Sequence, residues 1–475
     1  MKEYKNNKEK GITLVALVVT IVVLIILATV SVNAVMGDNG IIGRAKKAKA
    51  LYENSQKAEG EAMSDLVGEI DNKVYAKLYT DGTLIFSSTD YTDATRTVSE
   101  DYGDISNQSA YFNETASKVI GDMPGWIDEK GNNKATNVII HDTIYPTSTG
   151  LWFIEYKGTT LDLSNLNTSY TTNMSGMFAR CEKLTVLDVS SFNTRNVSNM
   201  SYMFAGCREI TSLNIDSFNT SNVTDMSAMF IACSKLTTLD LSNFNTRNVT
   251  NMFEMFAGCS GLTTLDLSEF DTGNVTNMFK MFISCNSLIT LDLSNFNTRN
   301  VTNMSEMFNR CSGLTALDLS KFDTGNVTSM TGMFAGCSGL TTLNLSEFDT
   351  GNVTTMYGMF DECSNLTALD LSKFDTGNVT SMTAMFAGCS GLTTLDLSNF
   401  NTSKVTGMSD MFNGCSSLTS LDLSSFNTSK VKYMSQLFHN CTKLTQIYVG
   451  SKWTTANATT TNMFNGCGTS SVTVK

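Results

Sequence analysis

The sequence of 475 residues is poor in histidine and in basic residues. It has only two histidines, His141 and His439, so it offers no histidine cluster for acid–base catalysis or for a multi-histidine metal site. It has 33 Lys and Arg against 45 Asp and Glu, which gives a formal net charge of −12. A protein that binds nucleic acid needs a basic face to displace counterions from phosphates. We therefore expect no nucleic-acid partner.

Catalytic motifs are also absent. The sequence has no nucleophile elbow, no phosphate-cradling glycine loop and no pair of acids outside its repeated letters. A residue that recurs ten times is a poor candidate for a single catalytic role. The sequence therefore predicts a protein that is not an enzyme and carries no cofactor. Only residues 74–136 leave room for a separate catalytic fold.

The cysteines reveal a long repeat. Each cysteine follows the previous one by 26 residues, without insertion or deletion, from Cys181 to Cys467. A period of this size is typical of a solenoid, in which each unit buries its apolar edge against its neighbours. We expect twelve such units over residues 161–467, followed by a short tail at 468–475.

Each unit contains a strand-like part and a helix-like part. In the unit after Cys259, Leu265 and Leu267 alternate with an outward Asp266, as in a short strand. A turn-rich stretch follows. The next apolar residues have the spacing of a short helix or 3₁₀ segment: Val275, Met278, Met281 and Phe282. The predicted fold class is an α/β repeat.

The constant spacing also predicts the environment of the cysteines. In register, each thiol lies over the next in a buried column, where it behaves as a small apolar group. Disulfides between adjacent units are an alternative. A metal site is a weaker one, because no Cys-x-x-Cys pair and no histidine at ligand spacing occurs. The methionine column from Met174 to Met434 is interpreted as core rather than as a copper site.

Residues 74–160 are expected to form a small β-rich region that caps the solenoid. Val74–Ser87 has the pattern of a hairpin turning at Asp81 and Gly82. The polar stretch 88–118 is interpreted as a loose connection. Two further strands are expected at 138–140 and 151–154.

The isolated Trp126 is interpreted as a packing anchor of this region rather than as part of a site.

The N-terminus has the pattern of a membrane anchor. Lysines dominate residues 1–11, and an uncharged run extends from Ile12 to Met36. As a helix, residues 12–36 would be about 37 Å long, which is enough to cross a bilayer. We expect an amphipathic helix or stalk over residues 37–73.

The segment Lys10-Gly11-Ile12-Thr13-Leu14-Val15 resembles the prepilin-type leader of type IV pilins and type II secretion pseudopilins. The resemblance implies cleavage after Gly11 by a membrane peptidase, which also methylates the new first residue, Ile12. It covers roughly 40 residues. At the fifth mature position the family usually has Glu, which helps to register subunits in a filament, whereas this sequence has Ala16.

The repeats resemble a second family. The pattern L-D-L-S-x-F-[DN]-T-x-x-V-[TS]-x-M-x-x-M-F-x-x-C is similar to the repeat of BspA-like leucine-rich-repeat surface proteins of bacteria. It covers nearly two-thirds of the chain. The resemblance implies a leucine-rich-repeat-like solenoid exposed on the cell surface, anchored here by the N-terminal segment, with a host or cell-surface protein as partner.

An acidic residue recurs at the outward strand position of most units. Stacked carboxylates would repel each other by about 1 kcal/mol per pair in a water-like dielectric. They are a candidate face for a cation or a basic partner; alternatively, each Asp bonds local backbone and the stripe is simply solvated. The candidate residues are Asp240, Asp266, Asp292, Asp318, Asp370, Asp396 and Asp422.

Three functions remain open. The first is an adhesin or partner-binding surface protein, with specificity at variable pairs such as Phe253-Glu254, Phe279-Lys280, Ser305-Glu306 and Tyr357-Gly358. The second is a minor pilin or pilus-tip component, and the third is passive display in the envelope.

Overall fold

The computed structural model describes residues 72–113 and 118–475. The predicted leader, transmembrane segment and most of the predicted stalk lie outside these residues, as do Gly11 and Ile12. Within the described residues, no helix is long and apolar enough to span a membrane.

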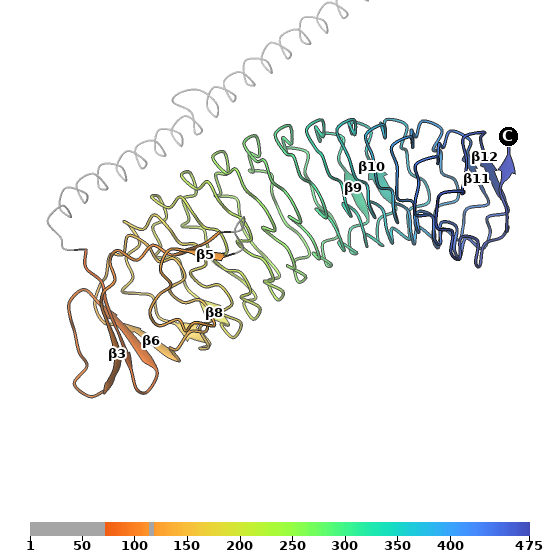
Figure 1. The fold of residues 1–475 in the computed structure, drawn as a ribbon. Helices are drawn as coiled ribbons and strands as arrows, with labels where there is room; N and C mark the ends of the chain where they lie inside the picture. Colours follow the sequence, from red (N-terminus) through yellow and green to blue (C-terminus); the bar gives the residue numbers. More distant parts are fainter. Residues whose placement is uncertain (1–71, 114–117) are drawn as a thin grey trace, which may run out of the picture. The chain divides into compact units, whose positions relative to one another are not determined.

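A small sheet precedes the solenoid (Figure 1). The strands β1 (Tyr75–Tyr79) and β2 (Thr83–Ser87) form an antiparallel hairpin. The hairpin turns at Gly82, whose φ of +80° favours glycine, so the predicted hairpin is confirmed. The strand β3 (Val98–Asp104) pairs with β1, and β6 (Asn137–Ile140) pairs in parallel with β2.

The prediction of a loose connection over residues 88–118 is wrong in part. This stretch contains β3 and also β4 (Tyr111–Asn113), which pairs with β5 (Lys118–Ile120). The sequence of β3, Val-Ser-Glu-Asp-Tyr-Gly-Asp, is polar because the strand lies at an edge of the sheet and is largely solvated.

The repeats wind into a solenoid of parallel coils (Figure 1). A ladder of parallel bridges joins equivalent residues of successive coils from Asn173 to Thr459, which confirms the twelve-unit solenoid. The L-D-L segments form short strands only in some units. These strands are β7 (Thr160–Leu161), β8 (Val186–Leu187), β9 (Ala316–Asp318), β10 (Thr342–Asn344), β11 (Ser420–Leu423) and β12 (Gln446–Val449), and β13 (Thr473–Val474) adds to β12.

The predicted helical part of each unit is wrong: the described residues contain no helix. The segment after each conserved Val is a chain of turns, which we call the turn ladder. The backbone N–H groups alternate between two kinds of partner. The Met281 N–H donates to the carbonyl of Met278 in the same coil (3.2 Å), whereas the Phe282 N–H donates to the carbonyl of Met307 in the following coil (2.9 Å). A helix would use all of these amides internally, whereas the turn ladder uses alternate amides to join coils.

The core is built from columns of identical residues. The Phe282 ring stacks on Phe256 and on Phe308, with centroids 5.7 Å apart in each case. The Met, Leu and Cys columns beside it are fully buried through almost the whole solenoid. Since each unit has the same residue type at the equivalent position of its coil, every interior coil buries its apolar edge against two neighbours.

A coil without the cysteine precedes the first predicted unit. Leu151 to Ile154, predicted as a strand, form a turn ladder whose amides bond to the coil of Cys181, for example from Phe153 to the carbonyl of Met177 (2.9 Å). Tyr156 occupies the position of the cysteine, 25 residues before Cys181 rather than 26. The bridge from Ser148 to Asn173 has the same spacing.

The small sheet caps this first coil. Trp126 is fully buried and donates its indole N–H to the carbonyl of Trp152 (2.8 Å), and the Asn133 amide donates to the carbonyl of Ile154 (3.1 Å). Phe86 of β2 stacks on Trp152 at 4.8 Å. The predicted role of Trp126 as a packing anchor is confirmed.

Candidate partner-binding face

The turn ladder exposes the positions that vary most between units. In the unit of Cys259 these positions are held by Phe279, Lys280, Ile283 and Ser284, and we call the equivalent side chains of all coils the variable face. The Met-Phe pair between them points inward and is buried, whereas the four are partly exposed. Backbone geometry fixes this alternation, so the face changes its chemistry from coil to coil on one unchanged scaffold.

One part of the variable face is aromatic. Phe253 and Phe279 of neighbouring coils stack with centroids 5.6 Å apart, and the Lys280 ammonium lies 4.8 Å from the Phe279 ring centroid. Ile283 lies partly exposed in the same coil as Phe279, and Tyr357 is 50% exposed further along. Partly exposed aromatic rings are the side chains most enriched at the centres of protein interfaces.

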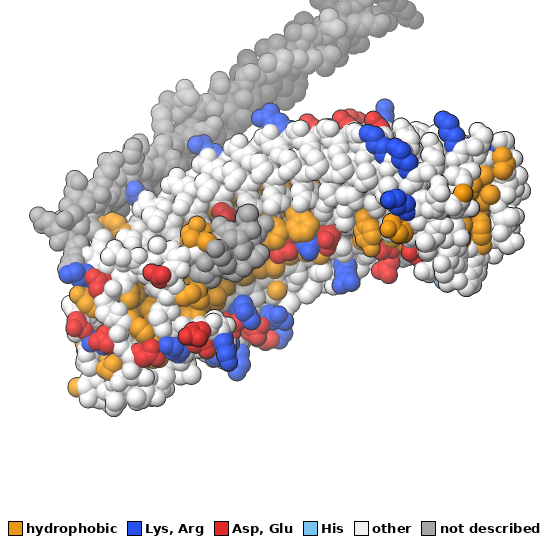
Figure 2. Space-filling model, viewed as in Figure 1, with side chains coloured by type: hydrophobic (Ala, Val, Ile, Leu, Met, Phe, Trp, Pro, Cys, Tyr) orange, Lys and Arg blue, Asp and Glu red, His pale blue; other side chains and the backbone are white. Residues whose placement is uncertain are grey.

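The adjoining part is charged and hollowed. Glu306, which lies 3.7 Å from the Lys280 ammonium, lines a hollow of about 410 Å³ together with Arg310, Asp361 and Glu362. Burial, together with the nearby Glu362 carboxylate, raises the pKa of Asp361 to about 6. The hollow therefore presents both signs of charge beside the aromatic part. Figure 2 shows hydrophobic and charged side chains gathered along one face of the coils, beside a broad uncharged surface.

The predicted acidic stripe is exposed and locally bonded. In the central units one carboxylate oxygen accepts the N–H of the Ser two residues on, as from Ser268 to Asp266 (2.9 Å). This bond lowers the pKa of Asp266 below its ordinary value. The other candidates make the same contact: Asp240, Asp292, Asp318, Asp370, Asp396 and Asp422. No group of three acids, cysteines or histidines poised for a metal occurs in the described part of the chain.

The repeats match a family model described as Mycoplasma protein of unknown function, DUF285. The matched segments are residues 147–213, 207–317, 286–390 and 359–474, which together cover more than half of the chain. The chain belongs to the DUF285 family. The first matched segment begins upstream of residue 161 and so includes the turn ladder of the coil that lacks the cysteine.

Three solved structures are similar to the DUF285 chain. A leucine-rich repeat protein from Eubacterium ventriosum has a TM-score of 0.29 and 16% identity, covering 73% of this chain and 93% of that one. The functional domain of InlJ from Listeria monocytogenes, which includes a cysteine ladder, has a TM-score of 0.23 and 17% identity. The match covers 68% of this chain and 71% of that one. The chain in the TLR13–ssRNA13 complex has a TM-score of 0.25 and 18% identity. The match covers 67% of this chain and 49% of that one. The chain thus spans about half the length of the TLR13 chain. No curated protein matches the sequence.

The cysteines of the DUF285 units form the predicted buried column. All twelve are free thiols, and all but Cys467 are buried. Each buried thiol donates to the carbonyl of the column Phe in the preceding coil, as from Cys285 to Phe256 (3.1 Å). Burial raises the pKa of the thiols, for Cys311 to about 12. The cysteine is thus a small core residue with one specific hydrogen bond.

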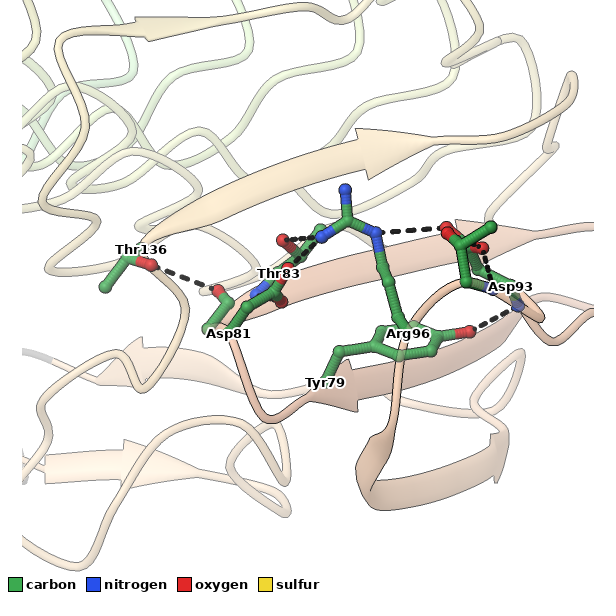
Figure 3. Close-up of polar contacts among 8 residues, drawn as sticks. Tyr79, Asp81, Thr83, Asp93, Arg96 and Thr136 are labelled. Carbon is green, nitrogen blue, oxygen red and sulfur yellow. Dashed lines mark hydrogen bonds and ion pairs between the residues drawn. The ribbon is translucent and has the colours of Figure 1, made fainter.

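A second cluster of charged side chains lies on the small sheet (Figure 3). Arg96 pairs with Asp81 and with Asp93, and the N–H of Asp93 donates to the Tyr79 hydroxyl (2.8 Å). These contacts tie the segment between β2 and β3 to the hairpin. The cluster is explained by this structural role.

The charged hollow is the feature that the sequence analysis missed. Its residues come from different coils, from Glu306 in one to Glu362 in another. They lie together because the turn ladder directs the side chains of the variable positions to the same side of each coil. A signal was available: with the units aligned on their cysteines, Glu306, Arg310 and Asp361 all occupy variable positions.

Proposed function

We propose that this DUF285 chain is a bacterial surface protein whose solenoid binds a partner protein through the variable face. The observation that carries the proposal is the combination of stacked aromatic rings and a charged hollow on coils that are otherwise nearly uniform. Drift on a passive spacer gives no reason for Phe253 and Phe279 to stack beside a lysine. An aromatic centre with charged groups at its edge is the anatomy of a protein interface.

The partner on this proposal is a protein of the host or of a neighbouring cell. The test coats beads with the full chain and counts the beads that cultured host cells retain. Replacing Phe253 and Phe279 with Ser should lower the apparent affinity by about tenfold or more, since central aromatic side chains commonly contribute over 1 kcal/mol each. A matched pair of replacements, Thr250→Ala and Thr276→Ala, lies in the same two coils off the variable face and should leave retention unchanged. Equal retention by both double variants would overturn the proposal.

The acidic stripe is a separate binding candidate that the same assay can test. Converting Asp266, Asp292 and Asp318 to Asn removes three charges but retains a side-chain oxygen that can accept the Ser N–H. If the stripe is only solvated, bead retention and Ca²⁺ binding stay as they were. Loss of either would assign the stripe a role in binding a basic partner or a cation.

Attachment to the cell membrane and exposure of the repeats outside the cell form the second part of the proposal. The motif around Gly11 and Ile12 supports it, and the same motif favours a pilus-tip component as the alternative. Intact mass of the native protein, with and without a prepilin peptidase, separates the two. A chain that begins at methylated Ile12 and is shed in sheared filaments favours the tip component. An unmethylated chain that stays with the membrane favours the tethered adhesin.

A further inference from the structure

We propose that the last coil of the solenoid is a second binding site, which takes up a peptide segment through a row of backbone amides. The site consists of the N–H groups of Thr460, Asn462, Phe464 and Gly466, which we call the terminal amide row. It lies at the end of the coils, not on the variable face, and the proposal does not depend on the function of that face.

In the interior coils the equivalent amides donate to the next coil, with Met304 as the single exception among the described residues. In the coil that ends at Cys363, for example, the Met356 N–H donates to the carbonyl of Ser381 in the next coil (3.0 Å). The Gly358 N–H donates in the same way to the carbonyl of Thr383 (2.9 Å). Two further bonds of the same kind follow, from Phe360 to Met385 (2.9 Å) and from Glu362 to Ala387 (2.7 Å). Four amides of one coil thus require four carbonyls of the next.

In the last coil the four amides have no hydrogen-bond partner among the described residues. The carbonyls between them are already engaged, because Thr461, Met463 and Asn465 accept from the coil before (2.8, 2.9 and 2.8 Å). The end of the turn ladder therefore presents donors only, at every second residue. Such a row is complementary to a chain segment that presents a carbonyl at every second residue.

An apolar surface lies beside the terminal amide row. Phe464 stacks on Phe438 with centroids 5.5 Å apart, and it also lines a hollow of about 750 Å³ with Trp453, Met463 and Val472. In the interior coils the equivalent Phe is covered by the Phe of the next coil. A peptide that carries an apolar ring at the matching position would continue this stack and bury Phe464.

A second copy of the chain does not fit this end. The first coil presents the complementary carbonyls, but those of Trp152 and Ile154 already accept from Trp126 and Asn133 of the cap. Two last coils placed face to face would bring donors against donors. The occupant that the groups favour is therefore a peptide segment of another molecule, with alternate free carbonyls and an apolar ring.

The test uses a synthetic peptide with the sequence of residues 380–388, Thr-Ser-Met-Thr-Ala-Met-Phe-Ala-Gly, which carries all four accepting carbonyls. Hydrogen–deuterium exchange of the full chain is followed by mass spectrometry with and without the peptide. The amides of residues 460–466 should exchange about tenfold more slowly when the free peptide is at about nine times its dissociation constant. Interior coils should not change, and the reversed peptide should have no effect.

A variant pair ties the protection to the site. Phe464→Ser should abolish it, whereas Val474→Ser, which replaces a side chain that is 68% exposed and does not line the hollow, should leave it intact. Unchanged exchange in the interior coils shows that both variants fold.

Three outcomes would overturn the proposal. The first is no protection at millimolar peptide. The second is slow exchange of residues 460–466 without any peptide, because the row would then already be covered. The third is protection that rises with protein concentration and appears at residues 150–154 as well, which would indicate a second copy of the chain as the occupant.

Discussion

At the scale of single residues, the buried threonines show how a polar side chain can lie inside a solenoid at little cost. Thr272 donates its hydroxyl to the carbonyl of Asn297 in the next coil (3.1 Å) and accepts the N–H of the same residue (2.8 Å). Both groups of one backbone residue are thus satisfied by one hydroxyl. The arrangement recurs along the solenoid and locks each coil to the next.

We expect Thr272→Val to destabilise the chain by about 1–3 kcal/mol, because it removes two partly buried hydrogen bonds to the backbone of Asn297, each worth about 0.5–1.5 kcal/mol. The midpoint of urea unfolding measures this. Thr264→Val, at an exposed position of the same coil, serves as the control and should change the stability by less than about 0.5 kcal/mol. Equal effects of the two variants would contradict the role assigned to the Thr272 hydroxyl.

The thiols give a second prediction at this scale. Burial raises the pKa of the column thiols, so little of the reactive thiolate exists near pH 8 and reagents cannot reach it. We expect one thiol per native chain to react with a colorimetric disulfide reagent, and twelve after denaturation. Cys467 is the half-buried one, so Cys467→Ser should remove the native signal. A fast reaction of several thiols in the native chain would contradict the buried column.

At the scale of the element, the turn ladder depends on residues with positive φ. Two positions of nearly every coil have φ near +60°, and Gly388 (φ +67°) is one of them. A Cβ there would lie 3.1 Å from the Cα of Glu362 in the preceding coil, so both the backbone conformation and the space favour glycine.

We expect Gly388→Ala to cost about 1–2 kcal/mol, mainly through the left-handed conformation. Gly325→Ala is the matched control. Gly325 has no positive φ, and the nearest atom to an added Cβ, the Oδ1 of Asp323, is 3.4 Å away, so that variant should be neutral or slightly stabilising. Thermal unfolding of both variants measures the difference, which should be at least several degrees if the ladder geometry is as described.

The turn ladder also marks where prediction from the sequence ends. The apolar positions of Val275, Met278 and Phe282 are correct, because the period alone determines which side chains face inward. Their spacing fits a helix equally well, and only the hydrogen bonds between coils distinguish the two. The coil at Leu151–Ile154 was missed for a related reason: Tyr156 replaces the cysteine and the spacing is 25, so nothing in the repeat pattern marks it.

At the scale of the whole molecule, the carboxylates of the hollow and of the acidic stripe should change the stability of the fold with pH in opposite directions. The pKa of Asp361 is raised to about 6 in the folded chain by burial and by Glu362, from an ordinary 3.8. The folded state therefore holds this proton more tightly. The resulting stability is full below about pH 4 and is lost as the pH rises through about 6. We expect Asp361→Asn to raise the Tm at pH 7 and to change it little at pH 4.

Asp266 is a control, because its contribution to stability should depend on pH in the opposite direction. Its pKa is lowered in the folded chain by the Ser268 N–H, so its ionisation adds stability at neutral pH that is lost as the pH falls through the folded pKa. Asp266→Asn should therefore lower the Tm at pH 7, by a small amount because the group is exposed. Shifts of the same sign in both variants would contradict this assignment.

The candidate site could be located only in part from the sequence. The variable pairs Phe253-Glu254 and Phe279-Lys280 were identified as positions of specificity, and the structure places them on one face. The hollow around Asp361 could not be predicted, because its burial depends on which side of the coil each variable residue takes.

The turn-ladder amides that join the coils point the same way, from each coil toward the one after it, as from Phe282 to Met307. A chain with this polarity can fold in the order in which it is made. In that order the cap at Trp126 would come first, and each completed coil would then offer the donors of its turn ladder to the next 26 residues. No coil needs a residue that emerges much later, so contact distances along the chain stay short and premature exposure of apolar surface is limited to one unit at a time. A protein that emerges from a ribosome or a translocation pore from its N-terminus would gain directly from such vectorial folding.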